Sequence, residues 1–182
     1  MLGRVPSNAS KIAYLYIPRL SNRVWGVPIF SGTTESELAR GIGHFTSSAP
    51  PGGEGNFSLF GHRTTHLKPF FGINVLRTGD EVIVETADAW YVYTLRVDKI
   101  VRPTDVWVAS NARYAPLGIP RGKKYRVLTL ISCEPRFSTE TRWVWWGELS
   151  AELPKGTMPP SLVVPTVRPI FIARIEASPQ RS

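Results

Sequence analysis

The sequence predicts an all-β fold, a barrel or a sandwich, with one or two short helices. Runs rich in β-branched and aromatic residues recur at short, fairly regular spacings, and these residue types favour strands. Only one short stretch carries helix signals, whereas a parallel α/β sheet needs crossovers of about a dozen residues, usually helical. We therefore expect seven or more short strands and find no internal repeat.

Length and composition fit one folded domain. The chain has 182 residues, of which 42% are hydrophobic, enough for a full core without a disulfide or a metal. Its single cysteine excludes an internal disulfide, which is compatible with a reducing compartment and with an exported enzyme that keeps a free thiol. No run approaches the ~18 apolar residues of a membrane span, and residues 1–11 lack the apolar core of a signal peptide, so we expect a soluble chain.

The basic charge leaves several partner classes open. The net charge is +8, and residues 1–34 contain basic residues and no acid. Nucleic acid, an anionic membrane surface and an acidic wall polymer all suit this sign of charge. The basic residues are scattered, without the Lys/Arg run of a dedicated nucleic-acid site, so we do not expect nucleic-acid binding.

The first elements are two strands, a helix and a third strand. Residues 12–17 and 25–30 are β-branched and aromatic runs closed by a proline and a glycine. Thr34 and Glu37 match a capping box, which predicts a short helix over 35–42. Proline and glycine then mark residues 47–55 as a loop, and a strand over 56–62 follows it.

Four further strands complete the domain. The segments 80–87 and 90–101 are separated by two residues and predict a hairpin. The most strongly β-forming segments are 125–132 and 142–149.

The chain divides into three segments. We expect an N-terminal extension over 1–11, a folded domain over 12–153 and an irregular tail over 154–182, which holds six of the 16 prolines. Within the tail, 162–164 and 170–175 are the segments able to add an edge strand.

Cys133 is the candidate nucleophile. It lies where a strand runs out into Glu134 and Pro135, and a strand end beside a turn presents a side chain to solvent. The alternative is a packing role, since free cysteines are among the most buried residues. A thiol with a pKa of about 8.5 is a minor thiolate at pH 7, so a reactive cysteine needs a base or a cation nearby.

His62 is the first candidate for the base. It ends the strand 56–62 directly after Gly61, where the missing Cβ lets another backbone approach closely, and it shares a strand face with Ser58 and Phe60. His44 follows a glycine-rich exit from the helix and has no partner cysteine or carboxylate nearby in sequence, so we interpret it as structural.

His66 raises the question of a metal site. With His62 it would form a zinc pair only on a helix, but two threonines weaken that helix and Arg63 replaces the glutamate of an HExxH motif. We therefore predict neither a metal site nor a cofactor from the sequence.

Arg142 is the candidate cation. It lies nine residues after Cys133, so a loop of about eight residues brings it back beside the cysteine if the two strands are antiparallel neighbours. By alternation it shares a face with Val144 and Trp146. Arg136 competes but lies in the connecting loop, and the Glu134 carboxylate next to the thiol would oppose thiolate formation.

The order of these residues resembles one enzyme family. A strand-end GHRTTH, then TLISC about seventy residues later, then an arginine in FSTETR together resemble the sortase cysteine transpeptidases, over residues 12–153. The stretches GIGHF, PPGGEGNFSLFGHRTTHLKPF and LRTGDEVIV are similar to class E sortases of actinobacteria. Ser132 and Glu134 depart from the family, where we expect threonine before the cysteine and commonly histidine after it.

The resemblance implies a closed eight-stranded barrel and a transpeptidase that cuts a C-terminal sorting signal after threonine. The signal would be LPXTG-like, or LAXTG for class E, and the acyl chain would pass to an amine of a peptidoglycan precursor. By position, Cys133 attacks the carbonyl, His62 transfers protons, and Arg142 binds the oxyanion or the substrate backbone. The family's usual N-terminal membrane anchor implies the extracytoplasmic face of the membrane.

Two alternatives stay open at the level of sequence. A hydrolytic cysteine peptidase would use the same residues and resolve the acyl-enzyme with water. A non-catalytic β-barrel module would bind wall polymer or nucleic acid through its basic surface, with Cys133 inert.

Overall fold

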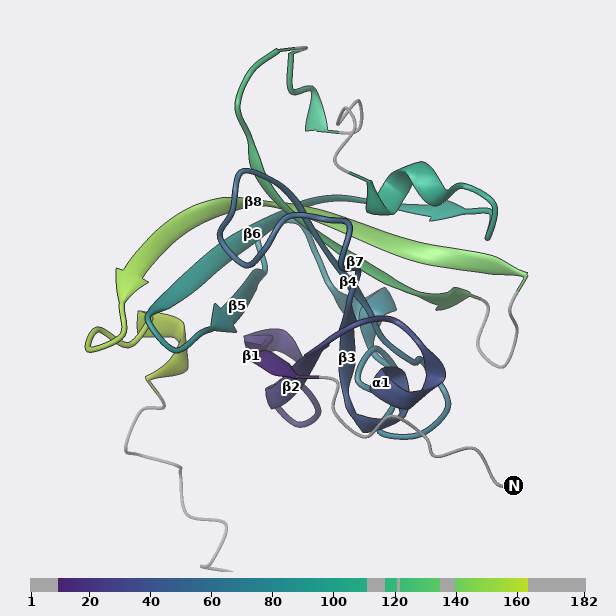
Figure 1. The fold of residues 1–182 in the computed structure, drawn as a ribbon, viewed down its shortest axis with the longest axis horizontal. Helices are drawn as coiled ribbons and strands as arrows, with labels where there is room; N and C mark the ends of the chain where they lie inside the picture. Colours follow the sequence, from purple (N-terminus) through teal and green to yellow (C-terminus); the bar gives the residue numbers. More distant parts are fainter. Residues whose placement is uncertain (1–9, 111–116, 121, 135–139, 164–182) are drawn as a thin grey trace, which may run out of the picture.

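Eight strands close into a barrel in the part of the chain that the computed structural model describes, residues 10–110, 117–120, 122–134 and 140–163 (Figure 1). The predicted all-β barrel is confirmed. Neighbour by neighbour, the strands are β1 (Lys11–Tyr16), β2 (Trp25–Ser31), β3 (Ile42–His44), β4 (Gly55–Phe60), β7 (Arg126–Glu134), β8 (Thr141–Pro154), β6 (Ala89–Val101) and β5 (Glu81–Glu85), which pairs back with β1.

Two of the eight strand contacts are parallel. β2 pairs with β3, and β4 pairs with β7, in parallel register, and the other neighbours are antiparallel. The β4–β7 ladder runs from the pair Gly55 and Arg126 to the pair Phe60 and Ile131. The hairpin β5–β6 lies between these two strands in sequence, so the pairing joins distant parts of the chain.

The helices are short and lie outside the sheet. The capping box predicted at the start of α1 is present, because the Thr34 backbone N–H donates to Glu37 Oε2 at 2.8 Å and the Glu37 carboxylate also contacts the Thr34 hydroxyl. The helical elements are α1 (Glu35–Arg40) and the 3-10 turns η1 (Pro18–Leu20), η2 (Ile73–Val75), η3 (Val106–Ala109) and η5 (Pro160–Leu162).

The predicted helix over 35–42 is too long at its C-terminal end. It stops at Arg40 because Ile42 already pairs with Ile29 of β2 as the first residue of β3. Gly41 and Gly43 allow this tight exit, since a Cβ at either position would lie 2.4–2.5 Å from a backbone carbonyl oxygen. The sequence analysis missed β3, whose three residues are too few to show alternation.

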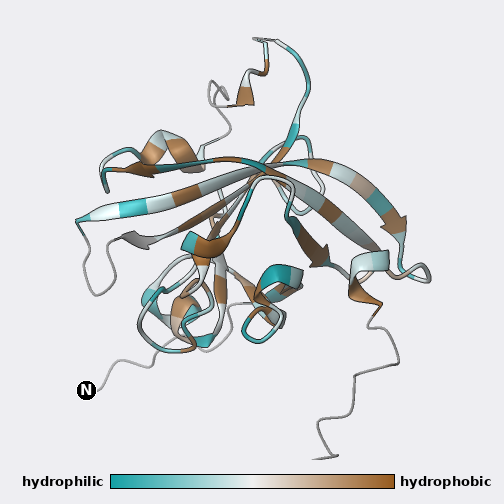
Figure 2. Ribbon diagram, turned by 180° about the vertical axis from the view of Figure 1, so that it is seen from behind, coloured by the Kyte–Doolittle hydropathy of each residue, from teal (hydrophilic) through white to brown (hydrophobic). Residues whose placement is uncertain are grey.

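β7 and β8 divide their side chains between two apolar clusters. The barrel interior receives Trp145, and the outer cluster under η3 receives Val144 and Trp146, as alternation in β8 predicts. Apolar and polar positions alternate along the long strands (Figure 2). β7 contributes Leu128 and Leu130 to the interior and Val127 and Ile131 to the outer cluster.

A buried asparagine fixes η3 to the barrel. Asn56 of β4 is fully buried, and its Nδ2 donates to the carbonyl oxygens of Val108 and Ser110, both at 3.2 Å. Its Oδ1 accepts from the Thr129 hydroxyl at 2.6 Å. Each such bond satisfies a group that would be costly to bury alone, so η3 is held as a fixed wall over β4 and β7.

The last strands are longer than the sequence predicts. β7 continues to Glu134 and β8 to Pro154, so Cys133 lies inside a strand. The turn η5 occupies Pro160–Leu162, where an edge strand over 162–164 was possible, and the second possibility, 170–175, lies outside the described residues. In the described part of the chain, no helix has the length and apolarity to span a membrane.

Candidate active site

Cys133 and Arg142 are cross-strand partners. The antiparallel register of β7 and β8 pairs these two residues directly, as predicted. Such partners have Cβ atoms about 4.5–5.5 Å apart on one face of the sheet. The thiol itself and the Glu134 side chain lie outside the described part of the structure, as does Arg136, so the effect of Glu134 on the thiol stays a prediction.

His62 follows β4 along the edge of β7. The Gly61 N–H donates to the Ile131 carbonyl at 3.1 Å, and the Ser132 hydroxyl donates to the Gly61 carbonyl at 3.1 Å. The backbone after β4 therefore stays beside β7, and extending the β4–β7 register by two residues beyond the pair Phe60 and Ile131 puts His62 beside Cys133. The prediction that His62 ends the strand was wrong by two residues, since β4 stops at Phe60.

An aromatic ring occupies the space beside Gly61 that a side chain would otherwise fill. The fully buried Phe70 ring packs so closely that a Cβ on Gly61 would lie 2.6 Å from it. The Phe70 N–H also donates to the His62 carbonyl at 3.1 Å. The close approach predicted at Gly61 is thus made by a side chain, and it fixes the backbone of His62.

Arg63 anchors the same turn to β8. Its side chain is buried, its Nη2 donates to Asn74 Oδ1 at 3.1 Å, and its guanidinium lies 5.4 Å from the centre of the Trp143 ring. Trp143 is the neighbour of Arg142 in β8, so this contact links the segment of His62 to the strand of Arg142. From the sequence, Arg63 was interpreted only as a mismatch to a zinc motif.

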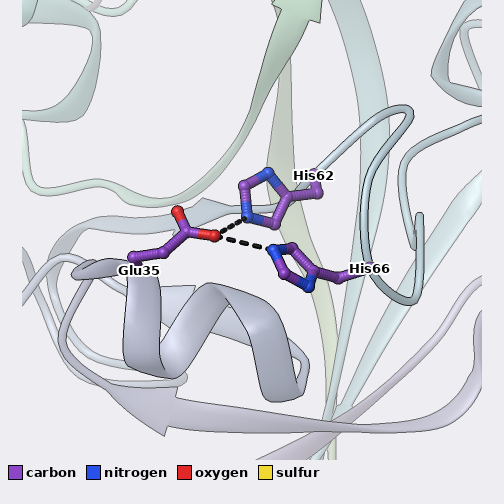
Figure 3. Close-up of side chains that lie close together, drawn as sticks. All are labelled: Glu35, His62 and His66. Atoms are coloured by element: carbon purple, nitrogen blue, oxygen red, sulfur yellow. Dashed lines mark hydrogen bonds and ion pairs between the residues drawn. The ribbon is translucent and has the colours of Figure 1, made fainter.

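A carboxylate from α1 reaches His62 (Figure 3). Glu35 Oε1 lies 3.3 Å from His62 Nε2 and 2.7 Å from His66 Nε2, and the two imidazole rings have centroids 5.0 Å apart. The His62 side chain is 18% exposed and the Glu35 side chain 70%. Glu35 was not among the predicted site residues, because no local pattern relates the first turn of a helix to a loop 27 residues later.

His44 has the structural role expected from the sequence. Its ring is buried, its Nε2 lies 3.0 Å from the Ala49 carbonyl oxygen and 3.1 Å from Ser48 Oγ, and it packs on Phe57. Burial lowers the pKa of His44, although the hydrogen bond to Ala49 opposes this shift. A neutral ring held in this way is unsuited to proton transfer at the surface.

Arg142 lines an apolar pocket beside the strand ends. Its side chain is half-buried, and Nη1 donates to the Thr141 carbonyl at 3.0 Å. The pocket has a volume of about 120 Å³, similar to the roughly 150 Å³ cavity that holds benzene, so it can accept one side chain. Its walls, shared between η3 and the sheet, include Phe45, Phe60, Val101, Val108 and Ile131.

An exposed apolar side chain also lines this pocket. Val106 of η3 is 75% exposed. η3 stands out as an apolar element on the surface (Figure 2). Apolar surface next to a pocket is typical of a site that binds a ligand or a peptide.

A larger cavity of about 650 Å³ lies at the opposite end of β7, around Lys124 and Arg126. Cys133 lies seven positions after Arg126 in this strand, roughly 23 Å away at the rise of a β-strand. The larger cavity is therefore remote from the thiol, so size alone does not identify the reactive site.

Comparison with known proteins identifies the family. The family model described as Sortase domain matches residues 15–150, more than half of the chain. Sortase SrtE1 of Streptomyces coelicolor is 35% identical over 162 residues, which are 84% of this chain and 44% of that relative. The chain therefore spans less than half of that relative's length.

Solved structures agree with this match. Sortase E1 from Streptomyces coelicolor, solved with a tripeptide in its active site, has a TM-score of 0.77 and 32% identity, covering 88% of this chain and 100% of that one. Sortase E from Streptomyces avermitilis has a TM-score of 0.75 and 33% identity, covering 86% of this chain and 99% of that one.

The environment of His44 predicts a loss of stability in mild acid. The lowered pKa means that the unfolded chain takes up a proton first as the pH falls below the ordinary value of 6.5. The free energy of unfolding should fall from there until the pH passes the pKa of folded His44. Chemical unfolding at pH 7.5 and 5.0 should show a smaller loss for His44→Gln, which keeps a donor but does not titrate. An equal loss of unfolding free energy in wild type and His44→Gln would contradict the assignment of this acid sensitivity to His44.

Proposed function

Because the chain belongs to the sortase family, we propose that it is a class E cysteine transpeptidase that cuts a sorting signal between threonine and glycine. The signal is LPXTG-like, with LAXTG preferred, as the resemblance of the sequence to class E sortases implies. The acyl chain is transferred to an amine of a peptidoglycan precursor at the extracytoplasmic face of the membrane.

This proposal rests on how the ends of β4, β7 and β8 are aligned with one another. β7 and β8 pair Cys133 with Arg142, and the segment after β4 runs beside β7 at the same end. A nucleophile, a proton carrier and a fixed cation are the groups that acyl transfer through a thioester requires.

The first half of the reaction forms the thioester. The Cys133 thiolate attacks the threonine carbonyl carbon, and the resulting oxyanion is stabilised by the guanidinium of Arg142. His62 donates a proton to the glycine nitrogen as the C–N bond breaks. The peptide leaves with a free amine, and the acyl chain stays on sulfur.

The second half restores the enzyme. His62, now neutral, removes a proton from the incoming amine, whose nitrogen attacks the thioester carbon. The C–S bond breaks and the thiolate leaves, so a new amide bond replaces the one that was cut. Neither half needs a metal ion or an organic cofactor as a reactant.

The pocket under η3 supports an extended peptide substrate. It borders Arg142 and Ile131, two residues before Cys133 in β7, so an apolar side chain held there would belong to a residue close to the scissile bond. η3 cannot swing away freely because Asn56 bonds its carbonyl groups. A fixed pocket lowers the conformational cost of binding a flexible tail.

The central experiment is transfer with a defined peptide. We expect a LAXTG peptide and a glycine-type amine to give a covalent adduct of the acyl fragment and a ligated product, both seen by mass spectrometry. Cys133→Ala should give neither. Absence of an adduct with every sorting peptide tried, from folded wild-type protein, would refute the function.

The same reaction without amine tests the hydrolytic alternative. A transpeptidase should release cleaved peptide slowly by reaction with water and much faster when the amine is added. Equal rates with and without amine, and no ligated product, would assign the chain to hydrolysis.

Arg142→Lys should lower the turnover rate by about a hundredfold or more, because lysine keeps the charge but loses the planar fork that binds an oxyanion. Arg96→Lys, an exposed arginine of β6 paired with Glu148, is the matched control and should turn over normally. Near-normal turnover by Arg142→Lys would transfer the role to Arg136.

A further inference from the structure

We propose that Glu35, His62 and His66 form a binding site for a divalent transition metal, zinc in the first place, and that the bound ion inhibits the enzyme by occupying His62. The binding site stands on geometry alone. The inhibition rests on the proposed role of His62 in proton transfer.

Small movements of side chains bring these three residues to the spacing of a metal site. Each offers one ligand atom, and the three atoms lie within 4.8 Å of one another. Zinc binds nitrogen and oxygen ligands at about 2.0–2.2 Å in a tetrahedron, which sets neighbouring ligand atoms about 3.3 Å apart. Glu35 and His62 meet this spacing at 3.3 Å. The 2.7 Å between Glu35 and His66 has to open slightly, which their exposed side chains allow.

The ligand types select the metal. Two imidazoles and one carboxylate are the set that catalytic zinc sites use, with a fourth position left for water. Calcium and magnesium prefer sites built only from oxygen atoms, so this set disfavours them. Imidazole nitrogen also suits copper and nickel, so these ions are expected to bind the same site.

The backbone holds His66 in place for this contact. His66 has φ 51°, a left-handed conformation that is uncommon for a residue with a side chain. The turn is closed by the Lys68 N–H, which donates to the Thr65 carbonyl at 3.0 Å. Strained backbone of this kind is often found at binding sites, because the surrounding structure has to impose it.

His62 presents a nitrogen suited to coordination. Its Nε2 is buried, and within the described residues it makes no hydrogen bond, since the contact with Glu35 is close but not aligned for one. A buried nitrogen without a hydrogen bond is costly, and a metal ion would satisfy it. One Glu35 carboxylate oxygen contacts this atom and the Nε2 of His66 (Figure 3).

The fold supplies what the sequence lacks. An HxxxH pair on a helix was rejected because residues 62–66 do not favour a helix, and the structure has no helix there. A loop brings the two rings together instead, and α1 adds the carboxylate across the barrel end. Metal and proton then compete for one imidazole, so the enzyme would be active only with the site empty.

Direct binding tests the site without any peptide. We expect isothermal titration of zinc chloride into the chelator-treated chain to show one ion per chain. Glu35→Gln and His66→Asn should each weaken binding by at least about tenfold, the lower limit seen when even indirect contacts to a metal are lost. Glu54→Gln, a surface carboxylate paired with Lys124 at the other end of β4, should bind as wild type.

Two results would overturn the site. One is equal zinc affinity in wild type, Glu35→Gln and His66→Asn. The other is binding that disappears in Cys133→Ala while both of those variants bind normally, which would assign the metal to the thiol. Glu35→Gln and His66→Asn both change exposed side chains. Circular dichroism of each variant will show whether it is folded.

Inhibition is measured separately in the transfer assay. Zinc should inhibit wild type reversibly, with activity restored by a chelator, and the concentration for half inhibition should rise at least about tenfold in Glu35→Gln relative to that variant's own metal-free rate. Zinc binding without any peptide turnover would retain the site and reject the proposed function. Turnover that zinc does not affect, despite binding, would reject the inhibition.

Discussion

The parallel pairing of β4 with β7 is the constraint on which the rest of the structure depends. It joins strands separated by the whole β5–β6 hairpin, and it sets the segment of His62 beside the end of β7. β8 then returns antiparallel from that end and carries Arg142 to the position opposite Cys133. A slip of one residue in either ladder would turn these side chains to the other face of the sheet. The buried side chains of Asn56 and Thr129 form a hydrogen bond between β4 and β7. A slip of one residue would break this bond.

The strands and the pairing of Cys133 with Arg142 were predictable because both follow from local pattern. Alternation in 142–149 separated the faces of β8 correctly, and the short spacing from Cys133 to Arg142 indicated a hairpin. The capping box at Thr34 was predicted for the same reason. Strand ends were less predictable: β4 stops at Phe60, and the neighbouring Gly61 packs on Phe70, a contact that the local pattern does not show.

What the sequence could not reveal depends on contacts between distant segments. Glu35 was interpreted only as part of a helix, and its distance to His62 follows from where α1 sits against the barrel end. Arg63 was interpreted as a motif mismatch, yet it is buried between Asn74 and Trp143. The pocket under η3 is also a product of tertiary packing, because its walls come from η3 and from four strands: β4, β6, β7 and β8.

The histidines illustrate how the environment assigns a role to one residue type. His44 is enclosed, hydrogen-bonded and biased to its neutral form. His62 lies at the barrel edge next to an exposed carboxylate and a second imidazole. The first position suits packing. The second suits exchange of a proton, and the same openness makes it accessible to a metal ion.

A disulfide trap tests the central pairing most directly. Neighbouring strands lie about 4.8 Å apart, within the Cα separation of about 4.4–6.8 Å that a disulfide requires. His62→Cys adds a second thiol to a chain that has one. If the register holds, mild oxidation will join the introduced cysteine of this variant to Cys133 in an intramolecular disulfide, and no free thiol will remain. The control Ser150→Cys, near the other end of β8, should keep two free thiols. Two free thiols remaining in folded, oxidised His62→Cys would contradict it.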